Sequence, residues 1–460
     1  MAIGGRSTTG RSREHVVPAR FMQPRIMLIV ATVLLVAFGL LMVYSASSVE
    51  ALTSTGDAAY YFKRQVLTTA VGVVAAIVLA KTDYHLWSQH LLLVIWAIAI
   101  ALLLFTAATG VATKGAVRWI EIAGISIQPS EFSKIVVVLA AANIAQHFFE
   151  EHDYSSSKML LYLAFGVVLP LGLILIQPDK GTTIILVVTL LVMAYLAGVP
   201  LRYIMLVLGL GGAFLLALIL GDDYSRSRVL TALNPQADPY GAGYQLNQGL
   251  YAFGNGGLFG VGIGLSRQKY SYLPEAHNDF IFAVIGEECG LVGTLAVVGL
   301  FALFIWAGMR IARYASDLSG RLIAAGCTTL IGFQFLVNVC GILGITPMTG
   351  KPLPFISYGG SSIMSCLMLV GFIISVSRAS NLPETVHDRR RSQLGVAPTS
   401  PSTSQNQGGV PSMRPRGLTL VSGGNTSRNR IDLGRGAYDR LRPSRSSRNS
   451  SNNRSSRFDR

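Results

Sequence analysis

The chain has 460 residues, of which 51% are hydrophobic and only 13% are charged. A soluble globular protein carries about 25% charged residues, and the apolar residues here form long runs. The composition therefore excludes an ordinary soluble domain, and it also lacks the short alternating segments of a transmembrane β-barrel. It predicts a polytopic helical membrane protein.

The net charge of +15 comes entirely from the two ends of the chain. Residues 1–25 contribute a net +4 and residues 378–460 a net +11, which leaves the part between them neutral. Basic ends on a membrane protein indicate a cytoplasmic side and contact with anionic lipid head groups. Nucleic acid is not expected as a partner, because the basic excess is terminal and spread over polar flanks.

Three parts are predicted along the chain. Residues 1–25 form a basic, disordered cytoplasmic N-terminus, residues 26–377 form the transmembrane domain, and residues 378–460 form a disordered, Arg- and Ser-rich cytoplasmic tail. The first apolar run follows basic residues, as a signal peptide does. This apolar run is longer than the apolar region of a signal peptide, which has about 7–15 residues. It is therefore interpreted as an uncleaved first span.

Ten apolar stretches follow one another in the transmembrane domain, and each is interpreted as a crossing helix of about 20 residues whose ends can be hidden in neighbouring protein. They are Ile26–Tyr44, Val66–Ala80, Leu91–Ala108, Ile135–Ala145, Met159–Ile176, Thr182–Gly198, Tyr203–Leu220, Phe280–Ile311, Leu322–Ile345 and Ile356–Val376. An even number of spans places both ends on one side, and the Arg-rich ends assign that side to the cytoplasm. The predicted fold class is an all-α polytopic membrane protein with about ten transmembrane helices and a large outer loop, residues 221–278, between helices 7 and 8.

The outward-facing segments carry more positive charge than orientation requires. Their cations are Lys114, Arg118, Lys134, Lys180, Arg226, Arg228, Arg267, Lys269 and Lys351. Three of these segments, residues 114–134, 177–182 and 346–362, also contain Pro or Gly at positions that break a regular helix. Irregular backbone at membrane depth is tolerated where it lines a cavity, so the breaks predict a shared outer cavity that handles an anionic ligand.

A Gly-rich stretch, Phe253–Gly264, raises the question of nucleotide binding. A phosphate-binding Gly loop needs a strand before it and a helix after it within a soluble βαβ unit, and that context is missing. Tight turns or close backbone approach to a lipid substrate are the preferred interpretations.

Three titratable residues, Glu275, His277 and Asp279, lie within five positions immediately before an apolar run. Carboxylates are costly near hydrocarbon, so a cluster at a membrane boundary indicates a function. The alternative is that Asp279 only caps the next helix, since Asp is a favourable N-cap residue. Read alone, the cluster does not decide between the two.

Several longer motifs resemble the SEDS family (shape, elongation, division and sporulation) of bacterial peptidoglycan polymerases, over about Ile26 to Arg378. The motifs are Tyr44-Ser-Ala-Ser-Ser48, Gly115-Ala-Val-Arg-Trp119, Gln128-Pro-Ser-Glu131, Gln177-Pro-Asp179, Gly243-Tyr-Gln-Leu-Asn247, Pro274-Glu-Ala-His-Asn-Asp-Phe-Ile-Phe282 and Leu353-Pro-Phe-Ile-Ser-Tyr-Gly-Gly-Ser-Ser362. The Pro274-Glu-Ala-His and Gly286-Glu-Glu288 segments are similar to the cell-division, FtsW-like branch. Asn278 departs from the Thr of many members.

The resemblance implies an inverting glycosyltransferase that joins lipid II disaccharides into glycan strands at the outer membrane face. Asp279 matches the family's catalytic aspartate and would act as the base, which fits the weak nucleophilicity of a sugar hydroxyl. Arg118, Lys269 and Lys351 are the candidate diphosphate clamps, with Arg267 and Lys134 behind them. Glu275 and His277 would orient Asp279 or the acceptor. Supporting roles are expected for Glu131, Gln128, Pro129, Ser357, Gly359 and Gly360.

The resemblance also implies a setting and partners. It predicts the cytoplasmic membrane of a bacterium, at the division septum, a class B penicillin-binding protein and other divisome proteins as partners, and lipid II as substrate. No cofactor is required, and a divalent cation at the lipid diphosphate is left open.

Three alternatives stay open at this point. They are a flippase or transporter of lipid II, a polymerase of the elongation (RodA-like) branch, and a scaffold that only recruits a division partner. A transporter often shows two repeated halves with helix breaks at the midplane. No clear internal repeat is seen here, and the breaks cluster on the outer side.

Overall fold

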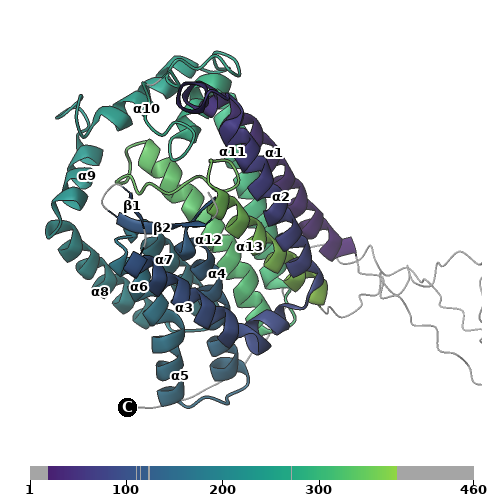
Figure 1. Ribbon diagram of the computed structural model, residues 1–460. Coiled ribbons are helices and arrows are strands. Elements are labelled where there is room, and N and C mark those ends of the chain that lie inside the picture. Colours follow the sequence, from purple (N-terminus) through teal and green to yellow (C-terminus); the bar gives the residue numbers. More distant parts are fainter. Residues whose placement is uncertain (1–18, 110, 114–115, 123–124, 271, 381–460) are drawn as a thin grey trace, which may run out of the picture. The chain divides into compact units, whose positions relative to one another are not determined.

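The computed structural model describes residues 19–380 apart from positions 110, 114–115, 123–124 and 271, and every structural statement below concerns those residues. Within this part the chain is mainly helical, as Figure 1 shows. The predicted Arg-rich tail lies outside the described residues beyond position 380, and most of the predicted N-terminal segment lies outside them before position 19.

The elements follow one another from the N-terminal helix to the last span. In order they are α1 (Ala19–Thr55), α2 (Tyr60–Lys81), η1 (Leu86–His90), α3 (Leu92–Thr109), β1 (Val111–Thr113), β2 (Ala116–Ile122), β3 (Ile125–Ile127), α4 (Pro129–Ala145), η2 (Gln146–Glu150), α5 (Ser156–Leu163), η3 (Ala164–Val168), α6 (Leu169–Ile176), α7 (Lys180–Leu196), α8 (Leu201–Leu220), α9 (Asp223–Leu233), α10 (Tyr244–Gly256), α11 (Ile281–Arg313), α12 (Leu318–Ile342) and α13 (Gly360–Ala379).

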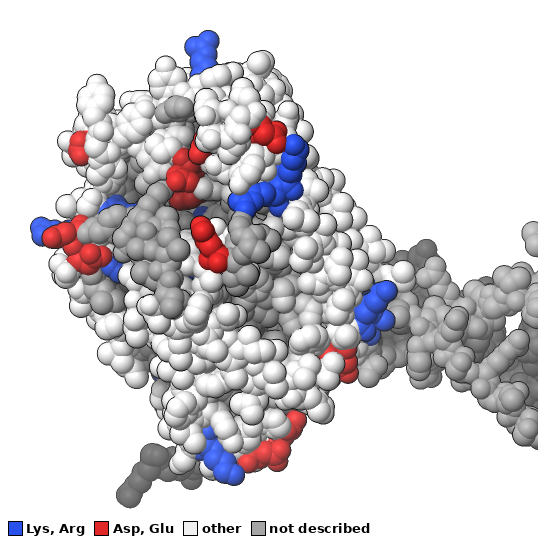
Figure 2. Space-filling view, in the orientation of Figure 1, with Lys and Arg blue, Asp and Glu red and all other residues white. Residues whose placement is uncertain are grey.

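The predicted fold class, a polytopic helical membrane protein, is confirmed. Seven helical stretches are long and apolar enough to cross a membrane, and three shorter apolar helices lie at residues 92–108, 180–196 and 201–214. Each predicted span overlaps one of these stretches. Figure 2 shows charged side chains gathered across the upper part of one face, above a broad surface that carries almost no charge. Such a surface suits hydrocarbon.

The interior of the bundle is formed by the C-terminal helices. Most of α12 and α13 is buried, with α2 packed along α13 and α1 along α11. The rings of Phe301 and Phe335 stack with their centroids 4.1 Å apart and join α11 to α12. In contrast, most residues of α8 are exposed, so this helix lies at the edge of the bundle.

Three local features differ from the prediction. The segment 114–134, predicted as irregular backbone, contributes β2 and β3 to a small antiparallel sheet in the order β1–β2–β3. Two helices, α9 and α10, form within the predicted outer loop. Helix α1 begins at Ala19, seven residues before the predicted transmembrane domain, and Arg25 accordingly lies in a helix, where its guanidinium donates to the Ser377 side chain and carbonyl. Polar and basic residues can extend an apolar helix beyond the membrane, and composition does not reveal where they stop.

The Gly-rich stretch packs against a break in α11. Gly290 has a φ of 66° inside this helix, and the amides of Leu291 and Val292 donate to carbonyls of Gly257 and Leu258. A Cβ on Gly256 would lie 1.9 Å from the Gly286 carbonyl oxygen. The glycines therefore allow two backbones to touch, as the close-approach interpretation expected, although the partner is a helix of the same chain.

Candidate active site

The three segments predicted to share a cavity do line one, with a volume of about 1160 Å³. Its walls come from segments far apart in sequence: α2, the small sheet, α7, α9, and the irregular segments before α11 and α13. Figure 1 shows α2 toward the right and α8 and α9 toward the left, with β1 and β2 between them. Ligand sites commonly span about 300–1,000 Å³, so this cavity has room for a large substrate or for two.

Asp279 lies on the cavity wall, two residues before α11 begins. The N-cap position of α11 is held by Phe280, so capping does not account for Asp279. A Cβ added at Gly350 would lie 3.3 Å from Asp279 Oδ2 and 4.0 Å from Arg228 Nη1, which places the carboxylate and the guanidinium around one point. An acidic oxygen therefore faces the cavity close to a cation.

Asn338 ties this aspartate to a neighbouring lysine. Its amide Nδ2 donates to the Asp279 carbonyl at 2.9 Å and to the Lys351 carbonyl at 2.8 Å. Because Asn338 is buried in α12, it holds both backbones against the same rigid helix. The base candidate and the clamp candidate are thus fixed relative to each other.

Lys351 lies on the cavity wall in a buried ion pair, with its Nζ 2.8 Å from Asp179 Oδ2. Asp179 also accepts hydrogen bonds from Gln128 Nε2, Ser130 Oγ and Thr182 Oγ1, at 2.9–3.1 Å. Burial alone would raise the pKa of Asp179, but the Lys351 ammonium and then the Arg118 guanidinium outweigh it and hold this pKa well below its usual range. The carboxylate therefore stays ionised and fixes the ammonium at the cavity.

Two further cations line the cavity, Arg118 from β2 and Lys180 from the first position of α7. Arg118 donates to the carbonyls of Gln177 and Pro178, which anchors its guanidinium to the turn before α7. Lys180 pairs with Asp222 at the start of α9, and hydrogen bonds from Lys180 and Ser225 lower the pKa of Asp222 to about 2. Arg118, Lys180, Arg228 and Lys351 all line the cavity. This wall is suited to an anionic group.

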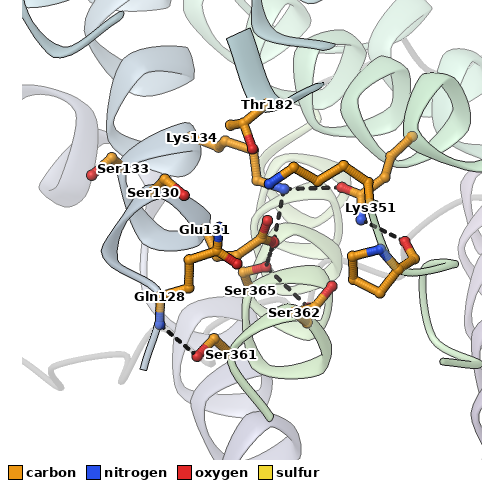
Figure 3. A network of polar contacts seen from close by, with 12 residues as sticks. Gln128, Ser130, Glu131, Ser133, Lys134, Thr182, Lys351, Ser361, Ser362 and Ser365 are labelled. Carbon is orange, nitrogen blue, oxygen red and sulfur yellow. Dashed lines mark hydrogen bonds and ion pairs between the residues drawn. The ribbon is translucent and has the colours of Figure 1, made fainter. Parts of the chain in front are cut away.

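Lys134, predicted to lie behind the clamps, is buried in a separate network. Its Nζ lies 2.8 Å from Glu131 Oε2 and 2.9 Å from Gln334 Oε1, and Ser365 Oγ donates to Glu131 at 3.1 Å (Figure 3). Neither Lys134 nor Glu131 is among the described residues that line the cavity. The pair connects α4 to α12 and α13, which gives Glu131 the supporting role expected of it.

Lys269 and Arg267 are also placed away from the cavity. The Lys269 ammonium donates to the Gly264 carbonyl and lies 3.5 Å from Glu288 Oε1, while Ser45 of α1 donates to the same carboxylate at 2.7 Å. Arg267 is exposed, and its amide donates to Glu287. A buried ammonium needs a counter-charge, and Glu288 supplies it here. The expected convergence of Lys269 with Asp279 on one cavity is therefore wrong.

The two remaining members of the acidic cluster take different positions. Glu275 lines the cavity, at a φ of 54°, and its carboxylate accepts a hydrogen bond from the Asn278 amide. His277 is buried away from it, with Nδ1 3.2 Å from Glu50 Oε2 and its ring 4.6 Å from that of Tyr61. The structure thus brings Glu275 to the site and puts His277 behind its wall.

The supporting residues hold the irregular segments in place. Pro129 is the first residue of α4, and Gln128 before it donates its backbone amide to Ser361 Oγ at 3.0 Å (Figure 3). Ser357 Oγ accepts from the Leu353 amide and donates to the Asn278 carbonyl. Gly359 donates to Gln65, and a Cβ on Gly360 would lie 2.9 Å from Thr68, so α13 can begin close to α2 only with glycine there.

Sequence reasoning did not select Asp179, Arg228 or Arg64 as site residues, although all three take part in the site or line it. Asp179 lies in a Gln-Pro-Asp turn between two apolar spans, and a carboxylate at that depth is itself a signal. Arg228 was noted only as an outer cation. Arg64 follows Lys63 in the sequence, and two neighbouring cations give no indication of which one faces a cavity.

Known proteins resemble this chain over most of its length. A family model described as cell cycle protein, covering FtsW, RodA and SpoVE, matches residues 25–382. The chain is 39% identical to the "Probable peptidoglycan glycosyltransferase FtsW" of Trichlorobacter lovleyi, over 79% of this chain and 96% of that one. It is also 39% identical to the "Stage V sporulation protein E" of Bacillus subtilis, over 78% and 98% of the two chains.

Solved structures show the same fold. One, from a study titled "Structural coordination of polymerization and crosslinking by a peptidoglycan synthase complex", matches with a TM-score of 0.61 at 25% identity, over 76% of this chain and 96% of that one. Another is the rod shape determining protein RodA of Thermus thermophilus, with a TM-score of 0.56 at 25% identity, over 77% and 97% of the two chains.

Proposed function

The chain belongs to the FtsW, RodA and SpoVE family of cell cycle proteins, and from this membership we propose that it is a peptidoglycan glycosyltransferase of the cell-division branch. Several relatives at 35–39% identity carry the name peptidoglycan glycosyltransferase FtsW, which favours this branch over the elongation branch. Its substrate in this proposal is lipid II, whose disaccharide units it joins into glycan strands at the outer face of the membrane.

One observation carries the catalytic part of the proposal: Asp279 lies on the wall of a cavity whose described lining also includes five cations, Arg64, Arg118, Lys180, Arg228 and Lys351. A sugar hydroxyl is a weak nucleophile and gains about 10²–10⁴-fold from a positioned base. A lipid diphosphate is already a good leaving group and needs neutralisation of charge instead of protonation. The cavity offers both kinds of group.

The reaction proceeds in a single displacement in this scheme. The acceptor 4-hydroxyl oxygen attacks C1 of the donor sugar while its proton passes to the Asp279 carboxylate. The new O–C1 bond forms as the bond from C1 to the phosphate oxygen breaks, with inversion at C1. The electron pair leaves with the diphosphate, where Lys351 and Arg118, with Arg228 and Lys180 nearby, neutralise it.

The proposed setting follows from the same relatives. The chain is a multi-pass membrane protein, and we place it in the cytoplasmic membrane at the division septum. One structural neighbour comes from a study of a peptidoglycan synthase complex that couples polymerisation with crosslinking. We therefore propose a crosslinking partner for this chain, a class B penicillin-binding protein, together with other proteins of the division machinery.

Polymerisation of lipid II by the purified full-length protein in detergent tests the function. We expect glycan strands longer than the dimer, detected by gel electrophoresis after the peptides are labelled. Detergent micelles offer no membrane to cross, so a flippase or a recruiting scaffold would give no polymer. Absence of polymer in the presence of the crosslinking partner as well would overturn the proposal.

Divalent metal is not required in this scheme, because protein cations supply the positive charge at the diphosphate. We expect the purified protein to polymerise lipid II in EDTA at the rate seen with added Mg²⁺ or Mn²⁺. His147, Glu151 and Asp153 could together hold a metal ion, but they follow the end of α4 opposite to Gln128 and the cavity. If EDTA stops the reaction and metal restores it, while His147→Ala behaves as the parent does, a cation belongs at the diphosphate.

A further inference from the structure

The cavity has a second wall whose chemistry differs from that of the cation-rich wall. Tyr358, Arg64, Thr68, Glu275 and Asn278 line it, from α2 and from the segments before α11 and α13. One ring, one cation, one carboxylate, one amide and one hydroxyl give a nearly neutral surface that can both donate and accept hydrogen bonds. The cations on the α7 and α9 side of the cavity are better suited to bind a diphosphate. The second wall is therefore available for an uncharged group.

Tyr358 presents its ring as a fixed platform on this wall. The Tyr61 ring meets it edge-on, at 5.0 Å between centroids and 75° between planes, and the His277 ring lies at 5.5 Å. Neither Tyr61 nor His277 is among the described residues that line the cavity, so both support Tyr358 from behind. The Arg64 guanidinium donates a hydrogen bond to the Tyr358 hydroxyl oxygen. Burial raises the pKa of this hydroxyl, so the hydroxyl stays neutral.

The platform is also held in register with the proposed base. The Tyr358 amide donates to the His277 carbonyl at 3.0 Å, and Ser357 Oγ donates to the Asn278 carbonyl at 2.6 Å. These two carbonyls belong to the residues directly before Asp279. Because the backbone that carries the Tyr358 ring is hydrogen-bonded to the backbone beside Asp279, the ring can hold a substrate at a fixed distance from the Asp279 carboxylate.

We propose that Tyr358, with Arg64 and Glu275, forms the subsite for the acceptor saccharide, an uncharged N-acetylated amino sugar that lies on the Tyr358 ring and turns its hydroxyl toward Asp279. The proposal rests on the proposed function, which requires a second sugar beside the one that carries the reacting diphosphate. It assigns His277 to positioning Tyr358, in place of the direct contact with Asp279 or the acceptor that the sequence suggested. The cavity volume of about 1160 Å³ leaves room for both sugars.

Binding of a soluble probe separates this subsite from the chemistry. The probe is chitotetraose, four β-1,4-linked N-acetylglucosamine units, observed by saturation-transfer NMR with the full-length protein in detergent. We expect binding by the parent protein, about tenfold weaker binding by Tyr358→Leu, and parental binding by Tyr358→Phe, which keeps the ring. Tyr240→Leu is the matched control, because Tyr240 is 90% exposed and is not among the described cavity-lining residues.

Kinetics provide the second readout. Tyr358→Leu should raise the KM for lipid II about tenfold and change kcat little, since the ring binds substrate but does not touch the reacting atoms. Arg64→Met should act in the same direction, and it replaces Tyr358→Leu as the test variant if thermal unfolding shows that the latter does not fold. Parental probe binding and KM in a folded wall variant would overturn the inference, as would an equal loss in Tyr240→Leu or no binding by the parent protein.

The two proposals fail separately. A parent protein that binds chitotetraose through Tyr358 but makes no polymer would contradict the glycosyltransferase function and leave the sugar subsite standing. A parent protein that polymerises lipid II while Tyr358→Leu is unchanged would contradict the subsite alone.

Discussion

Replacement of Asp279 by asparagine is expected to lower kcat for lipid II polymerisation by about 10²–10⁴-fold, because asparagine cannot accept the proton of the attacking hydroxyl. The change is nearly isosteric, and the tie from Asn338 to Asp279 uses the backbone carbonyl, which the variant keeps. Folding should therefore survive. The rate is measured as the appearance of polymer from lipid II in detergent, with thermal unfolding of each variant in parallel.

Asp57→Asn supplies the matched control for this experiment. Asp57 lies on an outer connection, between α1 and α2, and pairs with Lys63 at an exposed position. Its replacement should leave the polymerisation rate unchanged. A folded Asp279→Asn protein that makes polymer at the parental rate would remove Asp279 from the mechanism, and an equal loss in Asp57→Asn would show that the effect is not specific to the cavity.

The helical fold could be predicted because apolar runs dominate the chain and hydrocarbon allows few alternatives to a helix. The parts that were missed carry weaker signals. β1 and β3 have three residues each, too few for an alternating pattern to be recognised. Helices α9 and α10 are polar and lie in a segment where loop residues are also common, so their periodicity was hidden.

The site could be predicted only as far as single positions carry their own signal. Asp279 and Arg118 came from motifs and Lys351 from the pattern of outward cations, and the structure places all three on the cavity. Lys134 and Lys269 were also selected as outward cations. Each instead forms an ion pair away from the described cavity lining, Lys134 with Glu131 and Lys269 with Glu288. The spacing of Glu131 and Lys134, three residues apart on a helix, could have indicated a pair. No spacing in the sequence connects Lys269 with Glu288 or Lys351 with Asp179.

The pair of Lys351 and Asp179 leads to the second large expected effect. Removal of one partner of a buried ion pair leaves an uncompensated charge and costs about 3–5 kcal/mol of unfolding free energy. We therefore expect Lys351→Met and Asp179→Asn each to lower the midpoint of thermal unfolding. The double variant should recover part of the loss in stability, because it buries no lone charge. The exposed pair of Lys63 and Asp57 is the matched control for the same cycle, because water screens it and its removal should change the unfolding midpoint little.

In the double variant we expect stability to recover while polymerisation does not. This difference distinguishes an ion pair that only stabilises the fold from a lysine that also binds the diphosphate. If Lys351 neutralises the departing diphosphate, polymerisation stays strongly impaired even where stability returns, since Met carries no charge. The pKa of Asp179 is lowered in the folded protein, so its stabilising contribution is present above its ordinary pKa and is lost as pH falls toward the folded value. The double variant should therefore lose less stability on acidification than the parent does. Parental polymerisation by a folded double variant would show that Lys351 serves the fold alone, and the role of the cation would then pass to Arg118 and Arg228.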